Sequence, residues 1–110
     1  MNRHIPRFKA DILKALAHPT RISILECLRR GERCVCEIIE ELDIEQSNVS
    51  QHLAILKKMD LVDSRKEGLR VNYWVKYPEV FQILDLLDNV LVSQVEDTMS
   101  ALKGLSSRKF

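Results

Sequence analysis

Residues 34–59 read CVCEIIEELDIEQSNVSQHLAILKKM, and this stretch decides the fold. Its first part carries apolar residues on one side of a helix, and its second part places Val49, Leu53 and Leu56 at spacings of four and three residues. Between the two parts, residues 43–45 (Asp-Ile-Glu) form a short break. Two helices joined by about three residues are typical of a helix-turn-helix unit.

Two more helices are predicted upstream of this unit. Residues 8–17 repeat apolar side chains at helical spacing, and His18 and Pro19 then interrupt the pattern. Proline suits the first position of a helix, so a second helix is expected from Pro19 until Gly31 ends it. Residues 1–7 are expected to form a flexible arm.

The sequence changes period after the helix-turn-helix unit. Val71, Tyr73 and Val75 alternate with more polar neighbours, which predicts a strand, and Glu67-Gly68 separates it from a preceding extended run. Residues 61–76 are therefore expected to form a β-hairpin with a basic tip. The predicted fold is one domain over 1–110, mainly α with a small β-hairpin.

The last predicted helix, residues 78–103, is apolar over more than one narrow stripe. A domain of 110 residues has little spare core in which to bury such a helix, so a dimer contact is expected. The positions assigned to the contact between the first and last helices are Phe8, Ile12, Phe81, Leu84, Leu87, Leu91 and Val95.

Composition places the chain among soluble globular proteins. Apolar residues make up 45% and charged residues 30%, and the counts of glycine and proline, three each, favour long helices. The start of the chain lacks the apolar core of a signal peptide, and no run of apolar residues is long enough for a membrane span. A cytoplasmic protein without a membrane partner is expected. No catalytic set of residues stands out, so the chain is not expected to be an enzyme.

Net charge is only +1, so an interaction with nucleic acid has to be argued from the distribution of charge. The outward face of the predicted second helix of the unit is small and polar at its start, as a helix entering a major groove requires. The hairpin adds cations beside it. Three residues have other roles open: Ser47 as a helix cap, Gln51 as a solvated surface residue and His52 as a packing residue. The predicted DNA-contacting residues are Gln46, Ser47, Asn48, Ser50, Gln51, His52, Lys57, Lys58, Arg65, Lys66 and Arg70.

Four segments in order, LAHPTRISILECL, RCVCEIIEEL, QSNVSQHLAILKKMDLV and RKEGLRVNYWV, resemble the ArsR/SmtB family of winged-helix transcriptional repressors. The resemblance implies a homodimer packed through its first and last helices, with a recognition helix over 46–59 and a wing over 61–76. It also implies release from operator DNA when an effector binds. Two-fold symmetry makes an imperfect inverted repeat the expected operator.

Cys34-Val35-Cys36 resembles the metal-sensing box of the arsenic, antimony, cadmium and lead sensors of that family. A helix N-terminus beside Arg33 also favours thiolate over thiol. On an ideal helix, side chains two residues apart point about 200° apart, so a single ion can take both sulfurs only if the first turn is distorted or not yet helical. Such strain would pass through Asp43 to the recognition helix, which is the hypothesis for release from DNA.

The resemblance implies As(III) or Sb(III) as the foremost effector, with Cd(II) and Pb(II) as alternatives, but these ions need a third ligand. Ile39 stands where similar arsenic boxes often carry a third cysteine. Cys27 is therefore a candidate ligand, with burial as a small apolar side chain as the other reading. His4 is a weaker candidate, and the absence of histidine after His52 makes a zinc site on the last helix unexpected.

A redox or persulfide response is the alternative to metal sensing on the same fold. Disulfide, persulfide or sulfenic forms of the cysteines would then alter the affinity for DNA. Because the close i, i+2 geometry would strain a Cys34–Cys36 bridge, Cys27 is the expected disulfide partner under this alternative.

Overall fold

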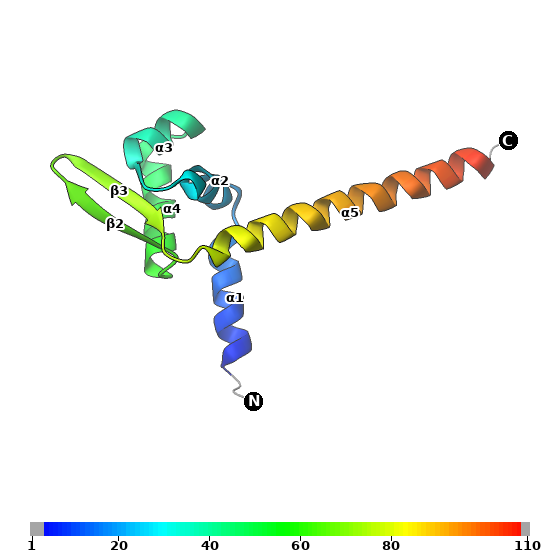
Figure 1. Cartoon of the computed structure of the whole chain (residues 1–110), viewed down its shortest axis with the longest axis horizontal. Helices are drawn as coiled ribbons and strands as arrows, with labels where there is room; N and C mark the ends of the chain where they lie inside the picture. The colour runs from blue at the N-terminus through cyan, green and yellow to red at the C-terminus, as the bar shows by residue number, and fades with distance from the viewer. Residues whose placement is uncertain (1–3, 109–110) are drawn as a thin grey trace.

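The structure is a computed structural model that describes residues 4–108 (Figure 1). It is mainly helical, with a three-stranded antiparallel sheet in the order β1-β3-β2. This confirms the predicted class of a winged helix-turn-helix. In chain order the elements are α1 (Ile5–Leu16), α2 (Pro19–Cys27), the 3-10 helix η1 (Leu28–Arg30), β1 (Arg33–Cys34), α3 (Val35–Leu42), α4 (Gln46–Lys58), β2 (Val62–Glu67), β3 (Arg70–Val75) and α5 (Glu79–Arg108).

The boundaries of α2 follow from its terminal residues. His18 is the N-cap, and its Nδ1 accepts a hydrogen bond of 3.1 Å from the backbone N–H of Thr20. Pro19 occupies the first helical turn, where its missing N–H costs nothing. After η1 the chain leaves the helical path at Gly31, whose φ of 125° is a conformation that side chains other than glycine rarely adopt. These predicted start and stop signals are confirmed.

A left-handed residue forms the turn between α3 and α4. Asp43 has φ 52° and ψ 47°, and its N–H donates to the carbonyl oxygen of Ile39 at 2.9 Å, which ends α3. Aspartate tolerates this conformation better than most residues. Helix α4 begins at Gln46, three residues after Asp43, and its N-cap Glu45 makes no side-chain cap hydrogen bond. Ser47 lies inside the helix, so the capping role left open for it is not observed. The predicted helix-turn-helix is confirmed.

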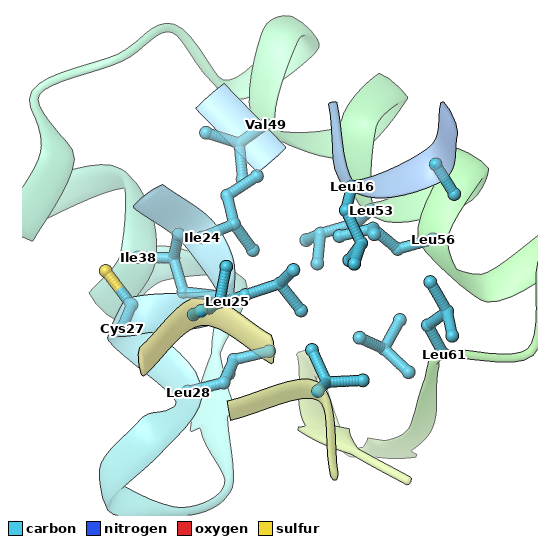
Figure 2. Close-up of a cluster of buried hydrophobic side chains, with 14 residues drawn as sticks. Leu16, Ile24, Leu25, Cys27, Leu28, Ile38, Val49, Leu53, Leu56 and Leu61 are labelled. Atoms are coloured by element: carbon cyan, nitrogen blue, oxygen red, sulfur yellow. The ribbon is translucent and has the colours of Figure 1, made fainter. Parts of the chain in front are cut away.

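The core lies where α2, α3 and α4 meet the start of the sheet and of α5 (Figure 2). Val49, Leu53 and Leu56 are fully buried, as their spacing predicts, so one face of α4 is anchored and the opposite face is presented to solvent. The other fully buried large side chains are Ile24, Leu25, Leu28, Ile38 and Val62.

The predicted hairpin is formed by β2 and β3, with Glu67 opposite Arg70 and a two-residue connection between them. Gly68 has φ 60°, which suits the first central position of a tight hairpin turn. A third strand, β1, pairs Arg33 with Tyr73 at the other edge of β3. It was not predicted, because two residues are too few to display an alternating pattern. Strand β1 matters here because it ends at Cys34.

Helices α1 and α5 project away from this core (Figure 1). The radius of gyration is 18.6 Å, whereas a compact chain of this size has about 13 Å. Over most of its length α5 exposes large apolar side chains, among them Leu91 with 59% of its surface accessible and Val95 with 61%. On α1, Phe8 is exposed as well. A single chain therefore leaves two apolar helix faces in contact with water.

Three expectations about the ends of the chain need correction. Helix α1 begins at Ile5, because a proline in its first turn is compatible with a helix, so only residues 1–3 of the expected arm lie outside the described residues. Helix α5 continues to Arg108, five residues beyond the predicted end. Leu84 is only 3% exposed and belongs to the core, because the first turns of α5 pack on the domain. It is not an exposed dimer position.

Candidate functional site

Cys34 and Cys36 form a disulfide at the start of α3. Cys34 is the N-cap, with an extended backbone (φ −70°, ψ 148°), and Cys36 lies in the first turn. Because Cys34 precedes the helix, the separation of about 200° that holds between two helical residues does not apply. The expectation that a disulfide would favour Cys27 over this pair is therefore wrong. The two sulfurs are bonded across the start of α3.

Hydrogen bonds hold the start of α3 in a reciprocal arrangement. The N–H of Cys36 donates to Sγ of Cys34 at 3.1 Å, and the N–H of Cys34 donates to Oε1 of Glu37 at 3.0 Å. This is a capping box in which a sulfur takes the place of the usual hydroxyl oxygen. The disulfide and the cap share Sγ of Cys34, so a change in the bonding of this sulfur also changes how the first turn of α3 is held.

A cation from the wing approaches the pair. Nη2 of Arg70 lies 4.0 Å from Sγ of Cys36 and donates to Oε1 of Glu37 at 3.1 Å. Arg33, which the sequence places beside the cysteines, instead pairs with Glu41 at 3.1 Å. No local pattern could have indicated the approach of Arg70, because 34 residues separate it from Cys36.

Cys27, the third cysteine, lies apart from this pair. It is buried at the edge of the core (Figure 2), and its Sγ–H donates to Oε2 of Glu41 at 2.5 Å. Burial first, and then the hydrogen bond to the Glu41 carboxylate, raise the pKa of this thiol from 9.0 to about 12. The hydrogen bond lowers the pKa of the Glu41 carboxyl. Cys27 is therefore a poor source of thiolate at neutral pH.

The described residues do not form a three-ligand metal site. Within residues 4–108, no group of three or more His, Cys, Asp and Glu side chains is arranged to hold a metal ion. His4, the other candidate ligand, is at the N-cap of α1 and contacts the ring of Phe8. Among the described residues, Cys34 and Cys36 bring two sulfurs together, and these become soft donors only when the disulfide is reduced.

The raised pKa of Cys27 predicts that the free energy of unfolding falls at alkaline pH. The neutral thiol is favoured in the fold, so its stabilisation is fully present below the unfolded-state pKa near 9 and is lost as pH rises toward 12. In a Cys34→Ser/Cys36→Ser background, the free energy of unfolding should fall between pH 9 and 11 with a slope approaching about 1.4 kcal/mol per pH unit from this group. Urea denaturation at fixed protein concentration measures it. Adding Cys27→Ser should remove that contribution, and equal slopes in the two proteins would contradict the assignment.

The outward face of α4 is exposed and polar at its start. Gln46, Ser47, Asn48, Ser50 and Gln51 are all accessible to solvent. They share one end of the helix whose opposite face is anchored in the core. Short side chains at this end leave room for another molecule to approach the helix closely.

His52 has the packing position that the sequence left open. Its ring lies 4.3 Å from that of His18, centroid to centroid, and Nη1 of Arg21 lies 3.3 Å from its Nδ1. Burial, together with the charges of His18 and Arg21, lowers the pKa of His52. His52 therefore joins α4 to the start of α2. Only the part of its ring that does not contact His18 or Arg21 is left for a polar contact with another molecule.

The predicted cations of α4 and the wing are exposed, although several have partners. Lys57 donates from Nζ to the hydroxyl of Ser64 at 2.6 Å, which joins α4 to β2. Arg65 pairs with Glu32 at 2.8 Å and with Glu67 at 3.0 Å. Such exposed ion pairs are weak, so Arg65 can exchange its partners for a polyanion at little cost. Lys58, Lys66 and Arg70 are also exposed.

No helix in the part of the chain that the structure describes is long and apolar enough to cross a membrane.

Comparison with known proteins connects this geometry to a family. Residues 18–64 match the family described as "Bacterial regulatory protein, arsR family". The HTH-type transcriptional regulator Rv0081 of Mycobacterium tuberculosis is 34% identical over 90% of this chain and 88% of its own length. Its crystal structure covers 89% of this chain and 99% of that chain, with a TM-score of 0.77.

The names of two further similar proteins describe repression and DNA binding. The arsenical resistance operon repressor of Staphylococcus xylosus is 32% identical over 89% of this chain and 91% of its own length. The homodimeric winged helix-turn-helix DNA-binding domain Mb0332 of Mycobacterium bovis, solved by NMR, has a TM-score of 0.74 and 29% identity, covering 87% of this chain and 92% of that chain. Together with the fold and the helix-turn-helix geometry, these similarities identify the chain as an ArsR-family transcriptional regulator.

Proposed function

We propose that this regulator is a homodimeric repressor that pairs through α1 and α5 and works in the cytoplasm. The apolar side chains that both helices expose support this, because a second copy would remove them from water. The homodimeric state of the similar Mb0332 domain supports it as well. The expected positions are Phe8, Ile12, Leu87, Leu91 and Val95, with Phe81, half-buried beneath Arg29, at the margin.

In this proposal α4 enters the major groove of operator DNA and the wing contacts the flanking phosphates. The exposed polar start of α4 has the short hydrogen-bonding side chains that reach base edges. The dimer carries two such helices, so the operator is an imperfect inverted repeat. His52 contributes mainly by fixing the position of α4.

The role of the wing predicts how DNA binding depends on salt. Arg65→Ala and Lys66→Ala should each weaken binding to all duplexes similarly, and should reduce the slope of log affinity against log salt by about one for each lost phosphate contact. Fluorescence anisotropy across a salt series measures this slope. Lys103→Ala, which removes a cation from the distant end of α5, is the matched control and should leave it unaltered. An unaltered slope in the wing variants would remove the wing from the DNA interface.

We propose further that the Cys34–Cys36 pair is the sensing site and that it responds to thiol redox state. The observation that carries this is the disulfide that closes on the cap of α3. In the oxidising direction, one cysteine thiolate attacks a low-molecular-weight disulfide RSSR, which gives a mixed disulfide and the first RSH. The other cysteine thiolate then attacks the mixed disulfide, which forms the Cys34–Cys36 bond and releases the second RSH. The cysteine sulfurs are oxidised, RSSR is reduced, and no other reactant is needed.

The link to DNA runs through the short turn at Asp43. The disulfide fixes the start of α3, and only three residues separate the end of α3 from the start of α4. Docking two recognition helices on one operator requires small adjustments of both, and the cross-link removes part of that freedom. The reduced dimer should therefore bind operator at least about tenfold more tightly than the oxidised dimer, which corresponds to a coupling free energy of about 1.4 kcal/mol.

Anisotropy titrations of reduced and oxidised protein with an inverted-repeat duplex test this proposal. Cys36→Ser should bind equally in reductant and oxidant, because it lacks the disulfide. Cys27→Ser is the matched control and should retain the full response, since Cys27 lies outside the pair. Equal affinity of the reduced and oxidised wild-type dimers would refute the redox role while leaving DNA binding intact.

Soft-ion sensing is the second candidate, favoured by the convergence of the two sulfurs and by similarity to an arsenical resistance repressor. As(III) or Sb(III) is the foremost ion, with Cd(II) and Pb(II) as alternatives, and Cys34 and Cys36 would hold it together with an external thiol or water. Titrating these ions into the reduced dimer on its operator separates the two candidates. Release of DNA by As(III) that persists in Cys27→Ser would favour a site of two protein thiolates.

A further inference from the structure

A hollow of about 450 Å³ adjoins the disulfide, between the start of α3, the start of α4 and the wing. Its walls include Cys36 from α3, Gln46 and Ser50 from α4, and Arg70 and Tyr73 from β3. Volumes of a few hundred Å³ are typical of sites for small molecules. The hollow thus places three features together: a reactive sulfur pair, a cation and the outward end of α4.

The charge of the hollow selects an anion. Of the described residues that line it, Arg70 alone is charged at neutral pH once the two cysteines are joined, and the others are apolar or neutral and polar. Arg70 forms an exposed ion pair with Glu37 at 3.1 Å, and such pairs are weak. Because a guanidinium has five N–H donors, donors remain for a carboxylate of a bound molecule. The apolar part of the wall, including Val71 and Ile39, suits the aliphatic part of the same molecule.

The two sulfurs differ in accessibility. Cys34 is only 3% exposed, whereas Cys36 is accessible to solvent and lies beside Arg70. A nucleophile from solution therefore reaches Sγ of Cys36. The sulfur that leaves is then Sγ of Cys34, which already accepts a hydrogen bond of 3.1 Å from the N–H of Cys36 at the start of a helix. Backbone N–H groups and the helix dipole stabilise a negative charge at that position.

We propose that this hollow binds a low-molecular-weight thiol that carries a carboxylate, and that this thiol forms a mixed disulfide with Cys36. The thiol first loses its proton to solvent, and its thiolate attacks Sγ of Cys36. A new sulfur–sulfur bond forms there as the Cys34–Cys36 bond breaks, and the electron pair leaves on Cys34 as a thiolate. The incoming sulfur is oxidised, the sulfur of Cys34 is reduced, and no external oxidant takes part.

The inference rests on the proposed redox function, and it names the reactant class that the sensing site accepts. An adduct on Cys36 would lie against Gln46 and Ser50, which also line the hollow and belong to the face of α4 proposed to read DNA. The bound molecule would therefore occupy space that the DNA needs. The same exchange run in reverse, from an oxidised low-molecular-weight thiol, gives the route by which the Cys34–Cys36 bond forms.

The adduct is best trapped where the second cysteine cannot resolve it. Full-length Cys34→Ser and Cys36→Ser proteins are reduced, treated with oxidised glutathione, and followed by intact-mass spectrometry without DNA. Cys34→Ser should acquire one glutathione on Cys36, identified by peptide mapping, at least about tenfold faster than Cys36→Ser acquires one on Cys34, because Cys34 is buried. Equal rates, or modification of Cys27 in place of Cys36, would overturn the assignment of the attacked sulfur.

The role of Arg70 is tested by charge. In the Cys34→Ser background, Arg70→Gln should slow the reaction with oxidised glutathione about tenfold but leave the reaction with cystamine, a cationic disulfide, no slower. Lys103→Gln, remote from the hollow, should change neither rate. Equal slowing with both reagents, or none, would overturn the carboxylate site. If adducts form with the expected selectivity but operator affinity does not depend on redox state, the thiol-binding hollow is supported and the redox-sensing function is refuted.

Discussion

Leu91→Glu is expected to convert the regulator into a folded monomer that binds operator at least about 100-fold more weakly than the wild type. Leu91 lies midway along α5 with 59% of its surface exposed in the single chain, so a glutamate is readily hydrated there in the monomer. In the dimer, the two-fold axis would bring two such carboxylates into one apolar interface. Burial of unpaired charge costs several kcal/mol, which is enough to separate the subunits.

Light scattering after size exclusion, circular dichroism and operator titration together measure this outcome. Ser93→Glu provides the matched control, since residues 91 and 93 point about 200° apart on the helix and the substitution adds the same charge. It should remain dimeric with wild-type affinity. A Leu91→Glu protein that is dimeric and binds normally would show that α5 does not form the interface.

Leu53→Ala is expected to lower the free energy of unfolding by about 3 kcal/mol. Leu53 is fully buried on the inner face of α4 and belongs to the core cluster (Figure 2). The substitution leaves a cavity that the surrounding helices can fill only in part. Because Leu53 anchors the helix whose outer face is proposed to read DNA, operator affinity should fall as well.

Urea denaturation at a fixed protein concentration measures the loss, since unfolding of a dimer depends on concentration. Ile55→Ala is the matched control on the same helix: Ile55 is 40% exposed, so its truncation should cost less than about 1 kcal/mol. Equal losses for the two variants would mean that α4 is not held by the face that carries Leu53.

Local patterns predicted the elements that depend on neighbouring residues. The spacing of Val49, Leu53 and Leu56 places them on the buried face of α4, as the structure confirms. His18 and Gly31 mark the start and stop that they predict, because caps and positive φ are properties of a few adjacent residues. Strand β1 and the true first turn of α1 were missed, since neither leaves a periodic signal.

The site was only half predictable. The Cys34–Cys36 pair was singled out, but its geometry depends on Cys34 being the N-cap rather than a helical residue, and helix boundaries are uncertain by one or two positions from sequence. The pairing of Cys27 with Glu41 and the approach of Arg70 to Cys36 join segments 14 and 34 residues apart. No spacing within a single element encodes such contacts.

The sequence by itself determined the helix-turn-helix, the wing and the exposed polar start of α4, because each follows from apolar periodicity, caps and turns within a few residues. Only the tertiary structure decided which sulfurs meet, which thiol is buried, that Leu84 belongs to the core, and that a hollow joins the disulfide to the face of α4. Those properties depend on how β1, α3 and the wing pack together. Packing brings together residues distant in the chain, and burial and charge there set the chemistry of each sulfur.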